Sequence, residues 1–600
     1  MLFKHTRLVF GAPRASAMTG ILLTLLSGPA MSQTMQMGKL KKAHSFTSDM
    51  GHIMLKMDHD MLAAPVTGNP DHDFASAMIP HHQSALDMAK LELLYGKDPV
   101  MRRLAQEIVA TQAEEIKLLH RRISQMAGAI IGTSPGRPLS FSTGRQSRDR
   151  VYTADQVSNT VSVIDPGSNT LLGVIRLGDP VPGALSPLYR GQLLVHGLGY
   201  SPDGKTLVAV ASGSNSLTFI DTATNLVKGV VYVGRAPHEA FFTPNGKEVW
   251  CAVRGENYIS VIDPVKLTEK RRIVTTNGPA MVLFSPDGRY AYVPSSFVSE
   301  LCVVDTSRYK VIARRKQFSP FSPNLAVSRD GKEVWITLKD TGRTQVYSGV
   351  PPFNLLATLN TGPISNHVTT IDNASGHFAY ISVGGLNLVK VYRRGRVPVL
   401  VASIPTGDLP HGIWGSPDGS RVYVGLENGG GVEAIDTLSN RVVAQVQVGQ
   451  LPQALVYVPN AVPSGDGKLN LTPLGAAGLA AHLRLTGEHA TGNVVVDSLG
   501  LVDTIQLAAS GLSPGNSYEL QLVSGPADPT AAPIPLLRFK ANPAGAAFPQ
   551  TIGPVRAAVT SSSVTGPACR YLRVIETKSG VVVLQQAASS DETAGKHDAD

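Results

Sequence analysis

Methionine and histidine are concentrated near the start of the chain, where their types and spacing could bind a soft metal ion. Of the 14 methionines, all but Met281 lie at or before Met126. Seven histidines are interleaved with them between His44 and His120. Thioether sulfur and imidazole nitrogen suit copper, and unlike thiols they stay usable where oxidants couple cysteines. This segment therefore predicts a copper site, with Cu(I) as the favoured ion.

The densest set of such side chains follows Asp71. Met78 precedes His81 and His82 by three and four residues, and residues at these spacings share one face of a helix. Pro80 lies between them and cannot donate a helical hydrogen bond. The sequence therefore predicts a helix that is kinked beside two adjacent imidazoles, which a kink could aim at a common point.

Three helices are expected to position these residues, over about 47–64, 69–95 and 98–126. In the first, Met50, Met54, Met57 and Met61 form one stripe. Such a stripe is also what adaptable core packing produces, so a structural role stays open beside a ligand role. In the third helix, Gln112 interrupts an otherwise apolar face and Glu115 lies beside it.

The pattern Asp-x-x-Phe-x-x-x-Met-Ile-Pro-His-His-x-x-Ala-x-x-Met-Ala, which begins at Asp71, resembles the bacterial family called domain of unknown function 305. The resemblance covers roughly 80 residues and implies a ferritin-like helical fold. Members of that family include periplasmic Met/His-rich proteins that bind copper or silver. The metal-site residues that the pattern and the resemblance together indicate are Asp73, Met78, His81, His82, Met88, Gln112 and Glu115, with Met54, Met57 and Met61 from the first helix. A di-iron site is disfavoured because the paired Glu-x-x-His motifs that it needs are absent.

The first 32 residues predict export. A basic region, an apolar stretch over 17–26, and the small residues Ala30 and Ser32 are typical of a signal peptide cleaved near Ser32. We therefore expect a periplasmic or secreted protein. No later segment has the roughly 18 apolar residues of a membrane span. The net charge is +9, but no dense Lys/Arg run is interleaved with aromatic residues, so nucleic acid is not an expected partner.

A repeat occupies residues 148–460, after a linker at 129–147. Turn glycines recur at Gly204, Gly246, Gly288, Gly331, Gly376 and Gly419. A period in the low forties with alternating strands is typical of four-stranded propeller blades. Counting a degenerate first copy near Asp149, the repeats predict seven blades, with an insertion at about 179–192. The final segment near 451–459 should supply the inner strand of the first blade. The repeats resemble the YVTN-type seven-bladed propeller family.

One position at the entrance of each inner strand is rich in histidine. It holds His196, His238, His367 and His411, with Gln453 in the closing strand. These four histidines could line one side of the channel mouth and form a second, weaker metal set. Alternatively, their imidazoles hydrogen-bond the backbone of neighbouring blades, as buried polar groups in a packed interior usually do.

Residues 464–586 predict a small antiparallel β-sandwich, because short alternating strands are separated by Gly/Pro/Ser turns. Residues 587–600 are small and polar, which predicts a disordered tail. The three cysteines are expected to be buried apolar side chains, with a disulfide between Cys251 and Cys302 as the alternative.

The expected protein is thus multidomain: a small ferritin-like helical domain at 44–128, a seven-bladed β-propeller and a C-terminal sandwich. The leading hypothesis is periplasmic sequestration of copper by the helical domain, with silver as a second candidate ion. The propeller would then be a platform for a protein partner, and no catalytic residues are assigned. One alternative is a propeller enzyme of lactonase-like or quinoprotein or copper oxidoreductase type, with its active site in the channel mouth. Another is a metal-free interaction scaffold.

Overall fold

The computed structural model describes residues 46–65, 70–98, 147–178, 193–475, 480–498, 503–523, 533–553 and 571–586, together with a few helical positions between 101 and 119. The predicted signal peptide, linker, blade insertion and C-terminal tail lie outside these residues. The chain divides into two units, Met1–Val109 and Ala110–Asp600, and each is considered separately below.

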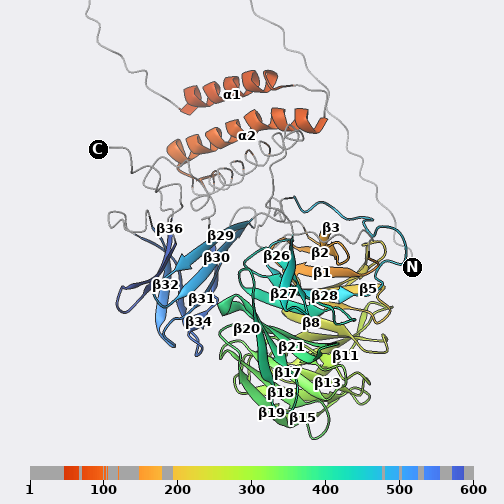
Figure 1. Ribbon diagram of the computed structural model, residues 1–600. Helices are drawn as coiled ribbons and strands as arrows, with labels where there is room; N and C mark the ends of the chain where they lie inside the picture. The colour runs from red at the N-terminus through yellow and green to blue at the C-terminus, as the bar shows by residue number, and fades with distance from the viewer. Residues whose placement is uncertain are drawn as a thin grey trace, which may run out of the picture. The chain divides into compact units, whose positions relative to one another are not determined.

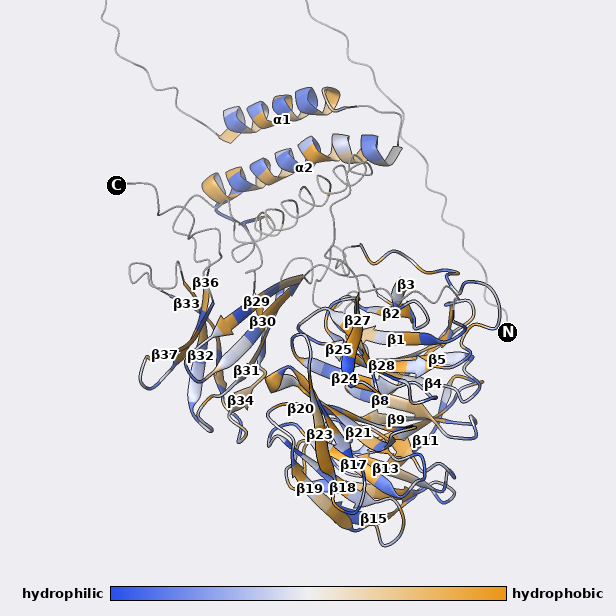
Figure 2. Cartoon of the chain, viewed as in Figure 1, coloured by the Kyte–Doolittle hydropathy of each residue, from blue (hydrophilic) through white to orange (hydrophobic). Residues whose placement is uncertain are grey.

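Two complete helices are described in the first unit. They are α1 (Phe46–Leu62) and α2 (Pro70–Tyr95), and they pack against each other. Figure 2 shows polar and apolar residues alternating along both helices, as expected where one face is covered and the other is wet. Helix α2 runs on through Pro80, where the Ser84 hydroxyl donates to the Pro80 carbonyl at 3.0 Å.

The predicted third helix is described at Met101, Arg102, Ala105, Ile108, Gln112, Ile116 and Leu119, all with helical backbone. Two complete helices do not establish a ferritin-like bundle. None of the helices among the described residues is long and apolar enough to cross a membrane.

Seven four-stranded antiparallel sheets form the propeller, which confirms the predicted architecture (Figure 1). Blade 1 holds β28 (Pro452–Val458), β1 (Arg150–Asp155), β2 (Thr160–Asp165) and β3 (Thr170–Arg176). Blade 2 holds β4 (Val195–Tyr200), β5 (Thr206–Ala211), β6 (Ser216–Asp221) and β7 (Val227–Tyr232). Blade 3 holds β8 (Pro237–Phe242), β9 (Val249–Val253), β10 (Tyr258–Asp263) and β11 (Thr268–Val274).

The remaining blades follow in chain order. Blade 4 holds β12 (Leu283–Phe284), β13 (Tyr290–Pro294), β14 (Glu300–Asp305) and β15 (Lys310–Lys316). Blade 5 holds β16 (Leu325–Val327), β17 (Glu333–Leu338), β18 (Arg343–Ser348) and β19 (Leu355–Asn360). Blade 6 holds β20 (Ser365–Asn373), β21 (Gly376–Val383), β22 (Leu388–Arg393) and β23 (Val399–Pro405), with the short 3-10 helix η1 (Gly384–Leu386) after β21. Blade 7 holds β24 (Pro410–Gly415), β25 (Arg421–Leu426), β26 (Gly431–Asp436) and β27 (Arg441–Gln447).

The ring closes where the sequence places the closure. Strand β28 pairs antiparallel with β1, joining Arg150 to Val458 and Val151 to Tyr457. Every residue of β28 is buried. Strand β28 comes from the far end of the repeat and covers the inner edge of blade 1. If this edge were open, it could pair with another chain.

The C-terminal strands are β29 (Ala480–Thr486), β30 (Thr491–Ser498), β31 (Asp503–Ser510), β32 (Ser517–Val523), β33 (Ile534–Lys540), β34 (Ala546–Ala547), β35 (Gln550–Gly553), β36 (Tyr571–Glu576) and β37 (Val582–Gln586). Hydrogen bonds join all nine in one antiparallel sheet, so the predicted sandwich of two separate sheets is not established. The joint between its halves is short, with Leu485 opposite Gln586 and Thr486 opposite Gln585. The inward residues of both halves share one core, including Leu485, Leu507 and Leu520.

Cys251 and Cys302 are buried and free, and they belong to different core clusters. They therefore form no disulfide, and their role as buried apolar side chains is confirmed. Cys569 lies outside the described residues.

Candidate functional site

Helices α1 and α2 run antiparallel. The ring of Phe46, at the start of α1, lies edge-on to that of Tyr95, at the end of α2, with centroids 6.0 Å apart. The Tyr95 hydroxyl donates to Asp49 at 3.2 Å, and further along α1 the ammonium of Lys56 lies within electrostatic range of Asp87.

Both helices rise by the same distance per residue. These contacts therefore determine which residues of α1 and α2 lie at the same height along the pair. Met61 lies at the level of Pro80 to His82, and Met54 at the level of Met88. The methionine stripe of the first helix is therefore brought alongside the Met/His set of the second.

Burial divides the predicted ligands of this unit. Met57, Met61, Met78, His82 and Met88 are half-buried. Met54 is 51% exposed and His81 is exposed. The rings of His81 and His82 have centroids 5.7 Å apart and are tilted by 58°, so they are close but not stacked.

The structure gives less support to the remaining predicted ligands. Asp73 is half-buried and interacts with Nδ1 of His72 at 3.3 Å. Gln112 is half-buried on helical backbone, but it belongs to the second unit of the chain. Glu115 lies outside the described residues.

In the propeller, each predicted histidine lies at the start of an inner strand, at a break in strand register. Register shifts fall at His196 in β4, at His238 in β8, between Ser365 and Val368 in β20, and between Pro410 and Ile413 in β24. A bulge of this kind re-aims a side chain out of the regular alternation. The backbone just before each bulge is left-handed, at Leu194, Ala236, Ile364 and Leu409.

The four histidines form two close pairs. The rings of His196 and His238 have centroids 4.2 Å apart, and those of His367 and His411 are 4.5 Å apart. All four are buried, with 4 to 8% exposure, and Val195 beside His196 is fully buried. We call these four residues the histidine ring.

Two ring members hold neighbouring blades together. Nδ1 of His238 bonds the Ala280 carbonyl at 2.6 Å, and Nδ1 of His411 bonds the Gln453 carbonyl at 2.7 Å. In both cases the acceptor occupies the equivalent position of the next blade. The other two members, one from each pair, are different, because Nδ1 of His196 and Nε2 of His367 are buried without a hydrogen-bond partner.

A second set of channel residues, which the sequence analysis missed, follows the second strand of each blade. Arg254 follows β9 in blade 3, Lys339 follows β17 in blade 5, and Glu427 follows β25 in blade 7. The same position is occupied in the other blades by Gln156, Ser212, Ser295 and Gly384. These residues share one repeat position, but the residue type differs from blade to blade, so no sequence pattern marks them.

Burial dominates the electrostatics of the channel. It lowers the pKa of His196 to about 3 and the pKa values of His238, His367 and His411 well below the ordinary value. All four imidazoles are therefore neutral near pH 7. Burial also lowers the pKa of Arg254 to about 10 and that of Lys339 to about 8, and raises that of Glu239 well above its ordinary value.

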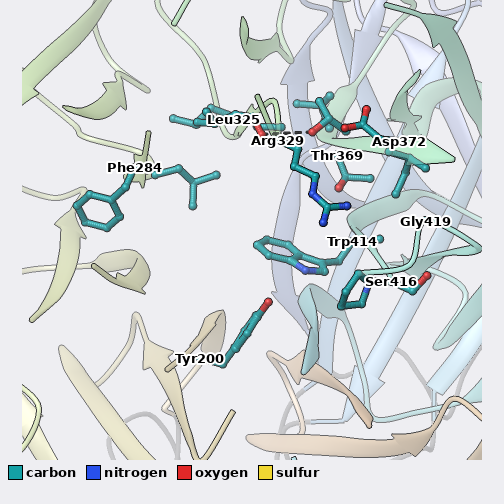
Figure 3. Close-up of a pocket in the computed structure, with 17 residues that line it drawn as sticks. Tyr200, Phe284, Leu325, Arg329, Thr369, Asp372, Trp414, Ser416 and Gly419 are labelled. Carbon is teal, nitrogen blue, oxygen red and sulfur yellow. Dashed lines mark hydrogen bonds between the residues drawn. The ribbon is translucent and has the colours of Figure 1, made fainter. Parts of the chain in front are cut away.

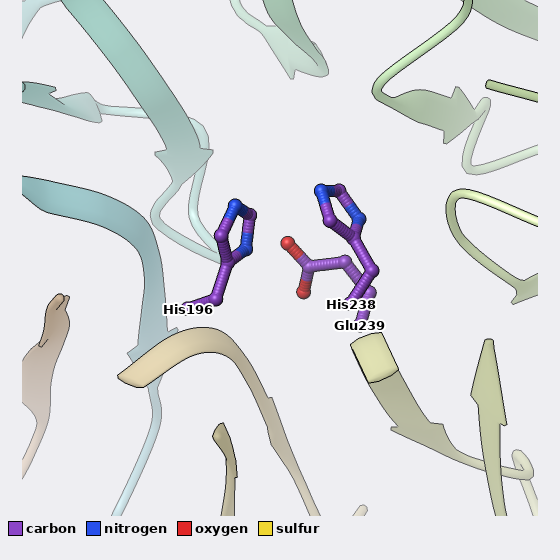
Figure 4. Close-up of side chains that lie close together, drawn as sticks. All are labelled: His196, His238 and Glu239. Carbon is purple, nitrogen blue, oxygen red and sulfur yellow. The ribbon is translucent and has the colours of Figure 1, made fainter. Parts of the chain in front are cut away.

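One compact group in the ring has the residue types of a metal site. His196, His238 and Glu239 offer ligand atoms that all lie within 4.8 Å of one another. The two imidazoles flank the Glu239 carboxylate (Figure 4). Bound ligand atoms lie about 2.0 to 2.2 Å from an ion such as zinc, so these side chains would have to close in further to hold one.

The C-terminal sheet contacts the channel end that carries the ring. Gln506 of β31 donates to Glu427 at 2.6 Å and to Asn428 at 2.9 Å. Phe548 stacks on Phe321, with centroids 6.1 Å apart, and its ring lies 4.3 Å from Nζ of Lys339. Further contacts join Ser510 to Gly385, Val495 to Val157 and Leu451, and Ala508 to Ile364 and Leu409. These contacts fall on blades 1, 5, 6 and 7.

Aromatic side chains cross the channel below the ring. Trp414 of β24 stacks on Phe241 of β8, with centroids 6.0 Å apart, and lies 6.4 Å from Tyr200 of β4. Because blades 7 and 3 lie on opposite sides of the ring of blades, this contact spans the channel. A pocket of about 450 Å³ lies next to Trp414, and Figure 3 shows Arg329 and Trp414 extending into it.

Comparison with known families bears on the first unit. Residues 12–123 match the family described as domain of unknown function (DUF305). This match includes the Met/His segment, so the resemblance inferred from its motif is confirmed. We refer below to this part as the DUF305 segment. No curated protein matches the chain.

Solved structures resemble the propeller at low identity. Kuenenia stuttgartiensis hydrazine synthase shares 19% identity, with a TM-score of 0.41, over 52% of this chain and 94% of that one. A periplasmic gluconolactonase of Pseudomonas aeruginosa shares 17% identity, with a TM-score of 0.42, over 52% and 99%. A functionally unknown protein from Desulfotomaculum acetoxidans shares 12% identity, with a TM-score of 0.44, over 52% and 99%.

Proposed function

We propose that the chain is an exported copper-binding protein whose DUF305 segment captures Cu(I). The observation that carries this proposal is the antiparallel pairing of α1 with α2, which brings Met61 to the level of His82. Met57, Met78 and Met88 are half-buried on the same two helices. Half-burial leaves sulfur atoms reachable by an ion and shielded from bulk water, and soft ligands of this type favour Cu(I).

The ligand set of the proposed site is Met61, Met78 and His82, with Met57 and His81 near it. Met88 lies about 9 Å further along α2 than His82, at the level of Met54, and would belong to a second binding level. Met54 contributes less because it is exposed. Asp73, Gln112 and Glu115 would act as polar support rather than ligands, since carboxylate and amide oxygens suit harder ions. Silver shares the preference for sulfur and is a second candidate ion. The histidine ring stays a prediction as a separate metal set.

Competition titration of the purified protein with a chromogenic Cu(I) chelator tests the copper site. The double variant Met78→Leu/His82→Ala should bind Cu(I) more weakly by roughly tenfold or more, because it removes one soft and one borderline ligand. His52→Ala/His59→Ala is the matched control, since both histidines are exposed on α1. Equal affinity of all three proteins would refute the proposed site.

Export is part of the same proposal, because a Met/His site suits an oxidising compartment. The signal-like residues 1–32 support it. Protein recovered from the periplasm or the medium should begin at Gln33, which N-terminal sequencing would measure. Recovery of the chain from the cytoplasm with its first 32 residues intact would contradict export. We also propose that the propeller binds a protein partner. Copper-dependent co-purification of that partner with this protein would test the proposal.

A further inference from the structure

Two cations in the propeller channel, the buried Lys339 and the half-buried Arg254, have no carboxylate within ion-pair distance in the described part of the chain. Instead they lie against aromatic rings. The Arg254 guanidinium is 5.9 Å from the ring of Phe297 and 5.4 Å from that of Phe321, and Nζ of Lys339 lies over Phe548.

Burying positive charge costs free energy unless a negatively charged group neutralises it. Lys339 is only 7% exposed, and charged side chains are almost never so deeply buried without a partner. Both cations also act on the same imidazoles, since each disfavours protonation of His196 and of His411. Both positive charges therefore lie near enough to the histidine ring to affect it electrostatically.

The nearest carboxylate is that of Glu427, and only one of its two oxygens is hydrogen-bonded. Oε1 of Glu427 accepts from Gln453 at 2.9 Å and from Gln506 at 2.6 Å. Its Oε2 lies 3.8 Å from Nε2 of His411. Glu427 is thus held in place by amide groups, and it offsets at most one of the two positive charges. Glu239 adds no negative charge, because burial favours its protonated form.

Hydrogen-bonding capacity is also left over. Nδ1 of His196 and Nε2 of His367 are buried without a partner, and a neutral imidazole can present an N–H at either nitrogen. Buried polar atoms are paired in the great majority of native proteins. Unused donors beside unneutralised cations are the features of a site built for an oxyanion.

We propose that the propeller channel, at the level of the histidine ring, binds a small oxyanion between Arg254 and Lys339, with N–H groups of His196 and His367 completing the site. The shared chemistry is a carboxylate, phosphate or sulfate group. The ligand enters on the side of blades 3 and 4, where Phe297 is 56% exposed at the rim, since the contacts of the C-terminal sheet lie on blades 1, 5, 6 and 7.

A cation at His196, His238 and Glu239 is the competing occupant. The same two positive charges oppose it, because like charges repel more strongly in a weakly screened interior than in water. Glu239 would also have to lose its proton against the effect of burial. The anion is therefore the favoured ligand.

Isothermal titration of the full-length protein with sulfate, phosphate and oxalate tests the proposal and separates the three ligand classes. Lys339→Met and Arg254→Met should each weaken binding by at least roughly tenfold, because each removes a charge-assisted hydrogen bond. Arg235→Met is the matched control, since Arg235 belongs to the neighbouring loop and is exposed. Its affinity should equal that of the unmodified protein.

Crystals of the unmodified protein soaked in selenate give a second measurement that does not depend on variant folding. Anomalous density between Arg254 and Lys339 would support the site. The proposal fails if all four proteins bind the anions equally or not at all, or if selenate density is absent there. Zinc or copper density on His196 and His238, without any anion, would overturn it in favour of a metal site.

Discussion

Burial decides the chemistry available to the channel side chains. The imidazoles are neutral near pH 7, so they act as hydrogen-bond donors or acceptors and not as charges. His238 and His411 use one nitrogen to bind the next blade. His196 and His367 keep a nitrogen unused. Histidine at this repeat position therefore agrees with both interpretations of the sequence. Two of the histidines support the structure by bonding the next blade, and the other two keep a nitrogen available for a ligand.

The charge on Lys339 makes anion binding depend on pH. Burial lowers its pKa to about 8, while Glu427 raises it and Arg254 lowers it further. Above that pH the amine becomes neutral, so sulfate affinity should fall by roughly tenfold between pH 7 and pH 9.5. Arg254 stays charged over most of this range, and the four histidines stay neutral throughout it.

Sulfate is the suitable probe because it does not titrate in this range. Calorimetry at several pH values should show the fall for the unmodified protein and a flat, weak profile for Lys339→Met. An unchanged affinity of the unmodified protein up to pH 9.5 would contradict the assigned role of Lys339.

The histidine ring was predictable from the sequence, but the charged residues near it were not. Repeat spacing alone placed His196, His238, His367 and His411 at equivalent positions. Arg254 and Lys339 escaped because each is one charged residue among unlike neighbours at its repeat position. Only the three-dimensional closure of the ring shows that blades 3 and 5 aim them at one space.

At the level of elements, the blade period predicted the propeller because each blade repeats one turn and one alternation. Blade closure was predictable for the same reason, since β28 matches the start of a repeat. The C-terminal fold was harder. Alternation identifies which side chains face inward, but it does not reveal the short β29–β37 pairing that joins the halves into one sheet.

Loss of β28 should therefore destabilise the whole ring. Leu455, Val456, Tyr457 and Val458 are buried, and each stabilises the fold by about 2 kcal/mol. Together they approach the entire stability of a typical domain, about 5 to 15 kcal/mol. A chain ending at Gln450 should show no cooperative thermal transition by circular dichroism. A chain ending at Gly475, which keeps β28, is the control and should retain one. Similar melting curves would show that closure matters little.

At the level of the whole second unit, the C-terminal sheet limits access to the histidine ring. Its contacts with Glu427, Phe321 and Leu451 lie on loops at that end of the channel. Ending the chain at Gly475 would expose the ring from above.

Modification by diethylpyrocarbonate measures this access. The four ring histidines should react roughly tenfold faster in the shortened protein, because the loops of blades 1, 5, 6 and 7 are then uncovered and the reagent is no longer restricted to the side of blades 3 and 4. His377, whose side chain is 70% exposed on blade 6, should react equally in both proteins and serves as the internal standard. Equal rates at the ring would mean that the sheet leaves it open. Mass spectrometry of peptides gives each rate.

Trp414 constricts one end of the propeller axis. Its indole joins blade 7 to Phe241 on blade 3 across the axis, so this stack narrows the channel at the end of β24 away from His411. A small molecule bound at the histidines would then exchange with solvent through the opposite end of the channel.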